Sequence, residues 1–165
     1  MSTSETPTLR LRPRDYAPGE NAVLAGIWRR AWISAQRGEK TVAPIGLWLS
    51  RVQAEFVPPA DVLLAERDEQ IVGFMMVLAQ RNYVAQLFIE PHLQREGLGQ
   101  SLLDEACVRM PTGWRLHVAT ANIAAQRFYE RYGLERGVVD RHPSNGRERV
   151  VYHWAPRIGR SMNRP

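Results

Sequence analysis

The stretch "LFIEPHLQREGLGQSLLDEA", residues 87–106, joins an apolar run to an amphipathic segment through a short polar loop. Pro91 ends the apolar run, since proline cannot donate to a sheet ladder. Gly97 and Gly99 open a segment in which leucines recur at helical spacing, so the pattern predicts a strand, a loop and a helix. The unpaired N–H groups at the start of such a helix, with its dipole, favour an anion by about 0.3 to 2 kcal/mol.

The glycine pair is a weak signal by itself and gains its meaning from the strand and helix around it. With 12 glycines in 165 residues, roughly 0.8 such pairs per chain arise by chance. A dinucleotide-binding loop would have a third glycine where Leu102 stands. A P-loop needs a lysine, and the single lysine, Lys40, lies elsewhere. The loop is therefore an anion cradle of another kind.

The charge of the chain does not point to a nucleic-acid partner. The net charge is +5 and the isoelectric point is near 10.0, but the last ten residues, "PRIGRSMNRP", hold three arginines and no acid. The rest is only mildly basic and has no basic run with interleaved aromatics. Arginine outnumbers lysine 21 to 1, which is typical of a GC-rich bacterial genome.

Length and residue types indicate one soluble domain. At 165 residues the chain can bury a core unaided, and it has no run of about 20 apolar residues that could span a bilayer. The first residues contain no apolar signal segment, so the expected location is the cytoplasm. The single cysteine, Cys107, excludes an internal disulfide, and no metal-ligand spacing is present, so we expect no metal.

The rest of the sequence alternates strand and helix patterns in an order that gives a mixed sheet with helices on its faces. Residues 61–80 form two strand-like runs around a polar turn, which is typical of a hairpin. Gly133 suits the left-handed cap at the end of a helix. The patterns predict further strands at 8–13, 82–91, 113–120, 134–142 and 147–154, and helices at 21–36, 47–56, 97–110 and 122–133.

Two segments of the chain resemble motifs of the GNAT N-acetyltransferases. Residues 87–106 resemble the acyl-CoA pyrophosphate loop of that family, an apolar strand followed by V/I-x-P, Q/R-x-x-G-x-G/A and a helix. "NIAAQRFYERYGL", residues 122–134, resembles the second motif, N-x-x-A-x-x-F/L-Y-x-x-x-G-F, with Leu134 in place of the usual aromatic residue. The matching positions of the second motif are Asn122, Ala125, Phe128, Tyr129 and Gly133.

The resemblance covers roughly residues 8–155 and implies an α+β fold of the GNAT type. This fold has a mixed, mostly antiparallel sheet of about seven strands with four helices, and its fourth and fifth strands splay apart around the cofactor. We expect a single acetyltransferase domain over 8–155, with flexible termini at 1–7 and 156–165. Homodimers are common in the family, and the sequence leaves that state open.

The resemblance also implies acetyl-CoA as the cosubstrate. The backbone of the fourth strand would bond the pantetheine arm, and the amides of the following loop would hold the pyrophosphate. Arg95 would contact a phosphate or stay solvated, and Asn122 would bond the pantetheine, cap its helix, or do both. The implied cofactor-binding residues are Leu87, Phe88, Ile89, Gln94, Arg95, Glu96, Gly97, Leu98, Gly99, Gln100, Ser101, Asn122, Ala125 and Tyr129.

The implied chemistry is direct attack of a neutral amine on a thioester. Tyr129 matches the family's general acid for the departing thiolate, the alternative being a core tyrosine. Deprotonating an alkylammonium at pH 7 costs about 4.6 kcal/mol, so a base is needed. Tyr83 and His117 stand at two positions where relatives place a glutamate; His117 is either that base or a strand histidine without catalytic work. Glu90 ranks below it, because a residue just before a proline more often points to solvent.

We therefore expect an acetyl-CoA-dependent N-acetyltransferase acting on a primary amine of a small molecule or peptide. Two alternatives stay open: a protein N-terminal acetyltransferase of the ribosomal-protein type, which the histidine at position 117 weakens, and a non-catalytic acyl-CoA-binding sensor, which Tyr129 disfavours. No motif identifies the acceptor. The tryptophans Trp28, Trp32 and Trp48 belong either to the core or to the wall of an acceptor pocket. Neither nucleic acid nor a membrane is an expected partner.

Overall fold

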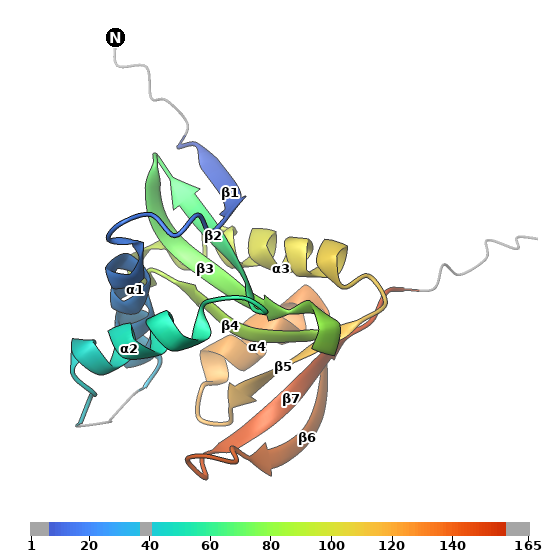
Figure 1. The fold of residues 1–165 in the computed structure, drawn as a ribbon. Helices are drawn as coiled ribbons and strands as arrows, with labels where there is room; N and C mark the ends of the chain where they lie inside the picture. The colour runs from blue at the N-terminus through green and yellow to red at the C-terminus, as the bar shows by residue number, and fades with distance from the viewer. Residues whose placement is uncertain (1–6, 37–40, 158–165) are drawn as a thin grey trace, which may run out of the picture.

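The computed structural model describes residues 7–36 and 41–157. Within them, one sheet of seven strands runs in the order β1-β2-β3-β4-β5-β7-β6, with helices on both faces (Figure 1). The β4–β5 pair is parallel and all other neighbours are antiparallel. This confirms the mixed, mostly antiparallel fold. Most of the predicted flexible termini, residues 1–6 and 158–165, lies outside the described residues.

All the predicted helices and strands are present, and their ends differ from the predictions by at most two residues. The strands are β1 (Leu9–Pro13), β2 (Asp61–Arg67), β3 (Gln70–Leu78), β4 (Tyr83–Ile89), β5 (Trp114–Ala119), β6 (Glu135–Arg141) and β7 (Glu148–Trp154). The helices are α1 (Glu20–Ala35), α2 (Ile45–Glu55), α3 (Leu98–Arg109) and α4 (Ile123–Tyr132), with short 3-10 turns at Ala79–Arg81 and Pro91–Leu93. None of the helices in the described ranges is long and apolar enough to cross a membrane.

The sheet separates two apolar layers. One layer joins α1 and α2 to one face of β2, β3 and β4, and the other joins α3 and α4 to the opposite face. Strand β5 shows how the sequence assigns the faces, because Trp114, Leu116 and Val118 alternate into the α3–α4 layer. Arg115 and His117 therefore point to the side of α1 and α2. This alternation decides which side chains can face a cleft on each side of the sheet.

Strands β4 and β5 touch at one end and part along the rest. Their single register pair is Tyr83↔Arg115, reinforced by a hydrogen bond of 3.0 Å from the Arg115 N–H to the Asn82 carbonyl. By contrast, β5 pairs with β7 along its whole length. The edge of β4 beyond Tyr83 consequently has no strand partner on the β5 side. The predicted splay of the fourth and fifth strands is confirmed.

A bulge in β4 lies next to the point where the strands part. The pairing with β3 passes from Val77↔Val84 to Met76↔Gln86, so Ala85 is an extra residue without a partner. A bulge bends its strand and increases the local twist. The bulge lies just beyond Tyr83, where β4 leaves β5, and Gln86 lies on the α1–α2 side of the sheet.

Gly73 of β3 allows close approach of the β4 backbone. A Cβ on Gly73 would lie 2.9 Å from the Phe88 carbonyl oxygen and 2.4 Å from Cδ1 of Ile89. Since the β4 backbone cannot yield as a side chain would, we expect Gly73→Ala to lower the free energy of unfolding by about 1–3 kcal/mol. Urea denaturation followed by circular dichroism measures this change.

Gly46, near the start of α2, is the matched control. A Cβ there meets no atom within 4 Å, so we expect Gly46→Ala to be neutral or to stabilise by about 0.4–1 kcal/mol through the unfolded state. Equal effects of the two substitutions would contradict the close-approach role of Gly73.

Candidate active site

The loop from β4 to α3 presents free backbone amides. The Ser101 backbone N–H donates to the Gly97 carbonyl at 3.0 Å, which is a first-turn hydrogen bond of α3. The N–H groups of the preceding residues 98–100 thus have no acceptor within the helix. They cluster at the positive end of the helix dipole, an arrangement that suits an anion such as a pyrophosphate.

The two glycines of this loop serve different ends. Gly97 has a left-handed φ of 84° and open space where a Cβ would lie, so its backbone conformation is what requires glycine. Gly99 has an ordinary φ, but a Cβ there would lie 3.0 Å from Cζ of Phe128. Gly99 therefore lets α3 and α4 approach, which brings the second sequence motif against the first.

Side chains around the loop are mostly engaged with one another. The Glu96 carboxylate forms an ion pair with Arg67, and the Gln94 amide donates to the Ile89 carbonyl at 3.3 Å. Arg95 is exposed and has a left-handed φ of 70°. The exposure fits the solvated alternative for Arg95 as well as a role in binding an anion.

The other predicted cofactor residues lie on β4 and on or just before α4. Leu87, Phe88 and Ile89 pair with β3 on one side and border the gap on the other. Asn122 caps α4, where its Oδ1 accepts a hydrogen bond of 3.1 Å from the Ala125 N–H. Of its two predicted roles, the cap is confirmed. The gap thus leads from the β4 edge to the amides at the start of α3.

Tyr129, on α4, lies in the apolar layer between the sheet and helices α3 and α4. Its side chain is 8% exposed and its ring centroid lies 5.2 Å from that of Phe128 and 6.2 Å from that of Tyr152. Burial raises the pKa of the Tyr129 phenol well above its usual range. The phenol is therefore protonated at neutral pH, and it can donate a hydrogen bond but cannot act as a base.

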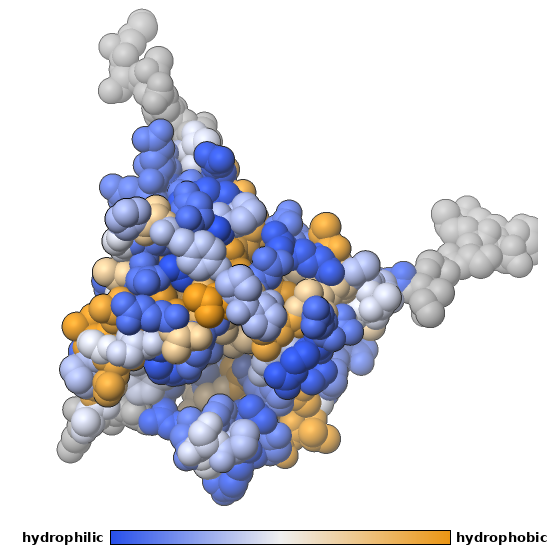
Figure 2. Space-filling view, viewed as in Figure 1, coloured by the Kyte–Doolittle hydropathy of each residue, from blue (hydrophilic) through white to orange (hydrophobic). Residues whose placement is uncertain are grey.

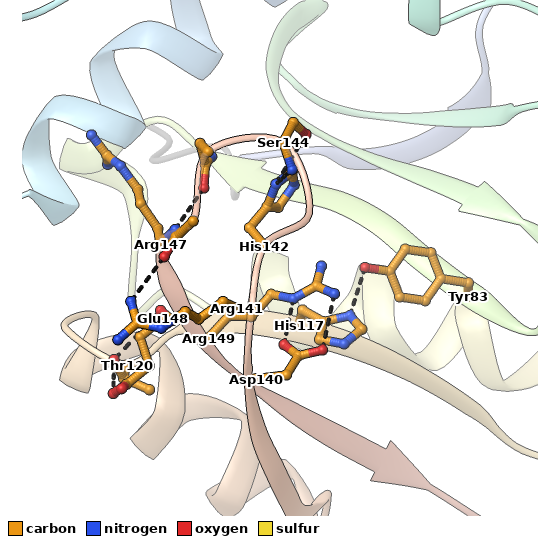
Figure 3. A network of polar contacts seen from close by, with 12 residues as sticks. Tyr83, His117, Thr120, Asp140, Arg141, His142, Ser144, Arg147, Glu148 and Arg149 are labelled. Carbon is orange, nitrogen blue, oxygen red and sulfur yellow. Dashed lines mark hydrogen bonds and ion pairs between the residues drawn. The ribbon is translucent and has the colours of Figure 1, made fainter.

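His117 lies across the gap and is joined to Tyr83 by a hydrogen bond. The Tyr83 hydroxyl and His117 Nδ1 are 2.8 Å apart, so the bond connects β4 to β5 at the closed end of the gap (Figure 3). Next to them, Arg149 binds Asp140 through two contacts of 2.7 and 3.2 Å. The four side chains form one polar network on the α1–α2 side of the sheet.

The environment of His117 disfavours its charged form. Burial lowers the pKa of the imidazole, and the nearby cations Arg149 and Arg115 lower it further, with His142 adding to them and Asp140 opposing. Neutral imidazole therefore predominates at pH 7. His117 has the protonation state that a base requires.

A cavity of about 420 Å³ opens on this side between the first two helices and the tip of the β6–β7 hairpin. Figure 2 shows the surface hollowed beside that tip. Trp28 and Trp48, only 3% and 7% exposed, belong to the core, which confirms that alternative, and they also line this cavity. The lining consists of Trp28, Trp32, Trp48, Arg51, Glu55, Gln86, Phe88, His142, Ser144 and Asn145.

The position of the Glu90 side chain differs from the prediction. We expected its side chain to point to solvent, but it is only 13% exposed and forms an ion pair with Arg30 of α1. The rule for residues that precede proline restricts their backbone and says nothing of the side chain. Its carboxylate is occupied by a guanidinium, so Glu90 still ranks below His117 as a base.

Comparison with known proteins agrees with this arrangement. Residues 49–150 match the family model described as the acetyltransferase (GNAT) domain. The chain belongs to the GNAT family. This protein is therefore an acetyl-CoA-dependent acyltransferase.

Two bacterial GNAT relatives are similar in sequence. Peptidyl-lysine N-acetyltransferase YjaB of Salmonella typhimurium is 27% identical over 135 residues, covering 77% of this chain and 83% of that protein. The N-acetyltransferase YafP of Escherichia coli is 26% identical over 125 residues, covering 74% and 79%.

Solved GNAT structures share the fold. The apo form of YjaB from Escherichia coli superposes with a TM-score of 0.70 at 22% identity, covering 90% of this chain and 97% of that one. The PaiA N-acetyltransferase of Thermoplasma acidophilum, solved with coenzyme A, gives a TM-score of 0.67 at 19% identity, covering 89% and 99%.

Sequence reasoning missed the partners of His117. Tyr83 was noted only as the residue at a glutamate position, and the Asp140–Arg149 pair was not foreseen. The period-2 pattern of β5 could have placed His117 on the polar face, but no local signal identifies its neighbours. Within the described part of the chain, no group of three or more His, Cys, Asp and Glu side chains could hold a metal ion.

The cations near His117 lead to a prediction about pH. We expect the pKa of His117 to lie below 6.5, and Arg149→Gln to raise it, because the substitution removes a positive charge and frees the Asp140 carboxylate. Two-dimensional NMR of the histidine ring signals measures the titration, with His117→Gln providing the assignment.

The lowered pKa of His117 also makes the free energy of unfolding depend on pH. The unfolded chain binds this proton more readily than the folded one, so the contribution of His117 to stability is lost as the pH falls below about 6.5. A His117 pKa above 6.5, or one that Arg149→Gln leaves unchanged, would contradict the proposed electrostatics.

Proposed function

We propose that this GNAT enzyme transfers the acetyl group of acetyl-CoA to a primary amine of a small molecule or peptide by direct attack. The observation that carries the proposal is the parting of β4 and β5. The free β4 edge runs from Tyr83, whose hydroxyl meets His117, to the loop that leads into α3.

The cofactor would occupy the gap. In the proposal, the backbone of Leu87–Ile89 bonds the pantetheine arm, residues 94–101 hold the pyrophosphate, and Asn122 and Ala125 border the arm from α4. Arg95 is placed to meet a phosphate because it is exposed at the same loop. No metal enters this scheme.

The proposed acid and base lie on opposite sides of the sheet. His117 would take the proton of the acceptor ammonium on the cavity side, and the amine nitrogen would then attack the thioester carbonyl. A C–N bond forms, the C–S bond breaks, and Tyr129 stabilises the departing thiolate with its hydroxyl or transfers its proton. This separation matches the needs of the reaction, because nucleophile and leaving group act from different directions.

The cavity beside α1 and α2 is the proposed acceptor site. The Salmonella relative named a peptidyl-lysine N-acetyltransferase makes a lysine side chain of a peptide the first acceptor to test. The ribosomal N-terminal activity has less support, since position 117 carries histidine. We place the enzyme in the bacterial cytoplasm, as one acetyltransferase domain over residues 8–155 with its oligomeric state open.

Turnover tests the proposal directly. Acetyl-CoA and a panel of amines, including an acetyl-capped lysine peptide, should release free thiol in a colorimetric assay. We expect Tyr129→Phe and His117→Gln each to lower kcat by about 100-fold while coenzyme A still binds, because the lost groups act on protons in the transition state. Tight binding of coenzyme A without turnover of any amine would favour the sensor alternative.

The loop glycine tests the cofactor site independently of turnover. Gly97→Ala forces a side chain into a left-handed conformation at a cost of about 1–2 kcal/mol, so the loop should relax and coenzyme A affinity should fall about tenfold. Isothermal titration calorimetry measures the affinity. Gly46→Ala, which lies on α2 in open space, should bind like the wild type. An unchanged affinity in Gly97→Ala would place the anion elsewhere.

A further inference from the structure

The bond between Tyr83 and His117 crosses the β4–β5 gap where the two strands are still held together. Tyr83 pairs with Arg115 in the parallel register, and His117 lies two residues further along β5, roughly 6.6 Å away along the strand. Diagonal neighbours of this kind are within reach of an aromatic side chain. The pairing at the closed end therefore fixes the position of the phenol relative to the imidazole.

The hydroxyl meets one particular nitrogen of the ring. It lies 2.8 Å from Nδ1, which leaves Nε2 on the side of the ring away from Tyr83. A neutral imidazole carries a proton on one nitrogen and a lone pair on the other. If Nδ1 carries the proton and donates it to the phenol oxygen, the lone pair of Nε2 is free; in the other tautomer Nε2 cannot accept a proton.

We propose that Tyr83 is a positioning residue that accepts a hydrogen bond from Nδ1–H of His117 and so presents an unprotonated Nε2 to the acceptor amine. The inference rests on the proposed acetyl transfer and adds to it the group that orients the base. A carboxylate or carbonyl oxygen commonly holds the Nδ1 proton of a functional histidine. Here a phenol would do so.

Electrostatics of the surroundings agree with a phenol in this role. Burial raises the pKa of Tyr83, although the cations Arg149, Arg115 and Arg81 oppose the shift, so the hydroxyl stays neutral. The Arg115 guanidinium lies 5.5 Å from the centre of the Tyr83 ring. Around His117 the facing groups are Arg115, Arg149, Asp140 and His142. A neutral acceptor orients the imidazole without adding a charge that would favour the imidazolium.

The tautomer of His117 tests the inference without any turnover. Long-range 1H–15N correlation NMR of the wild type near neutral pH should show the proton of His117 on Nδ1. Tyr83→Phe should lose this fixed form while the fold is kept, because it removes only the hydroxyl. A purely structural tyrosine would leave the tautomer unchanged in Tyr83→Phe. A wild-type proton on Nε2 would overturn the proposal.

Kinetics supply the second readout. Tyr83→Phe should lower kcat about tenfold, the size expected for one hydrogen bond, with the affinity for coenzyme A unchanged. Tyr16→Phe is the matched control, since Tyr16 is a half-exposed tyrosine remote from the gap and should behave like the wild type. A wild-type kcat in Tyr83→Phe would also overturn the proposal. Absence of turnover in the wild type would instead contradict acetyl transfer, and turnover with Nε2–H on His117 would contradict only the role of Tyr83.

Discussion

The rest of the site depends on the parting of β4 and β5. Buried backbone groups without partners cost about 1–3 kcal/mol each, so a sheet does not open without compensation. Three features surround the gap: β7 pairs with β5 along its whole length, β4 has a bulge at Ala85, and α3 and α4 pack against each other through Gly99 and Phe128. A ligand that offers amide groups along the gap would replace the missing strand and recover the lost hydrogen bonds.

The sheet also gives the two candidate catalytic groups different surroundings while keeping both neutral. Tyr129 lies in the apolar layer under α3 and α4, where burial raises its pKa. His117 lies on the face of β5 that it shares with Arg115, where burial and nearby arginines lower its pKa. At pH 7 Tyr129 is thus a neutral hydrogen-bond donor and His117 a neutral proton acceptor. Pairs of groups whose environments push their pKa values apart are typical of acid–base sites.

Local patterns predicted the helices and strands, because hydrophobic periodicity and turn residues act over short distances. They also predicted the loop of free backbone amides before α3, since Pro91, Gly97 and the first turn of α3 are contiguous. The bond from Tyr83 to His117 depends instead on the register between strands that are 34 residues apart along the chain at these positions. The prediction that the Glu90 side chain points to solvent was wrong for the same reason, because its partner Arg30 lies 60 residues away along the chain. Hydrophobic periodicity predicts the face of the helix or strand on which a side chain lies, but it does not predict which distant residue that side chain contacts.

The β4–α3 loop and the cavity beside α1 and α2 are built from different kinds of chemical group. The β4–α3 loop offers backbone amides, and Gly97 and Gly99 are the positions where its conformation or its packing requires glycine. The cavity on the other face is built from side chains of α1, α2 and the hairpin tip. Within it, Arg51 lies 4.4 Å over the Trp28 ring and pairs with Glu55, while remaining 51% exposed. In the proposed function, an acceptor that enters the cavity would share or displace this arginine. Substitutions on α2 would then alter the choice of acceptor while the backbone amides of the β4–α3 loop stay in place.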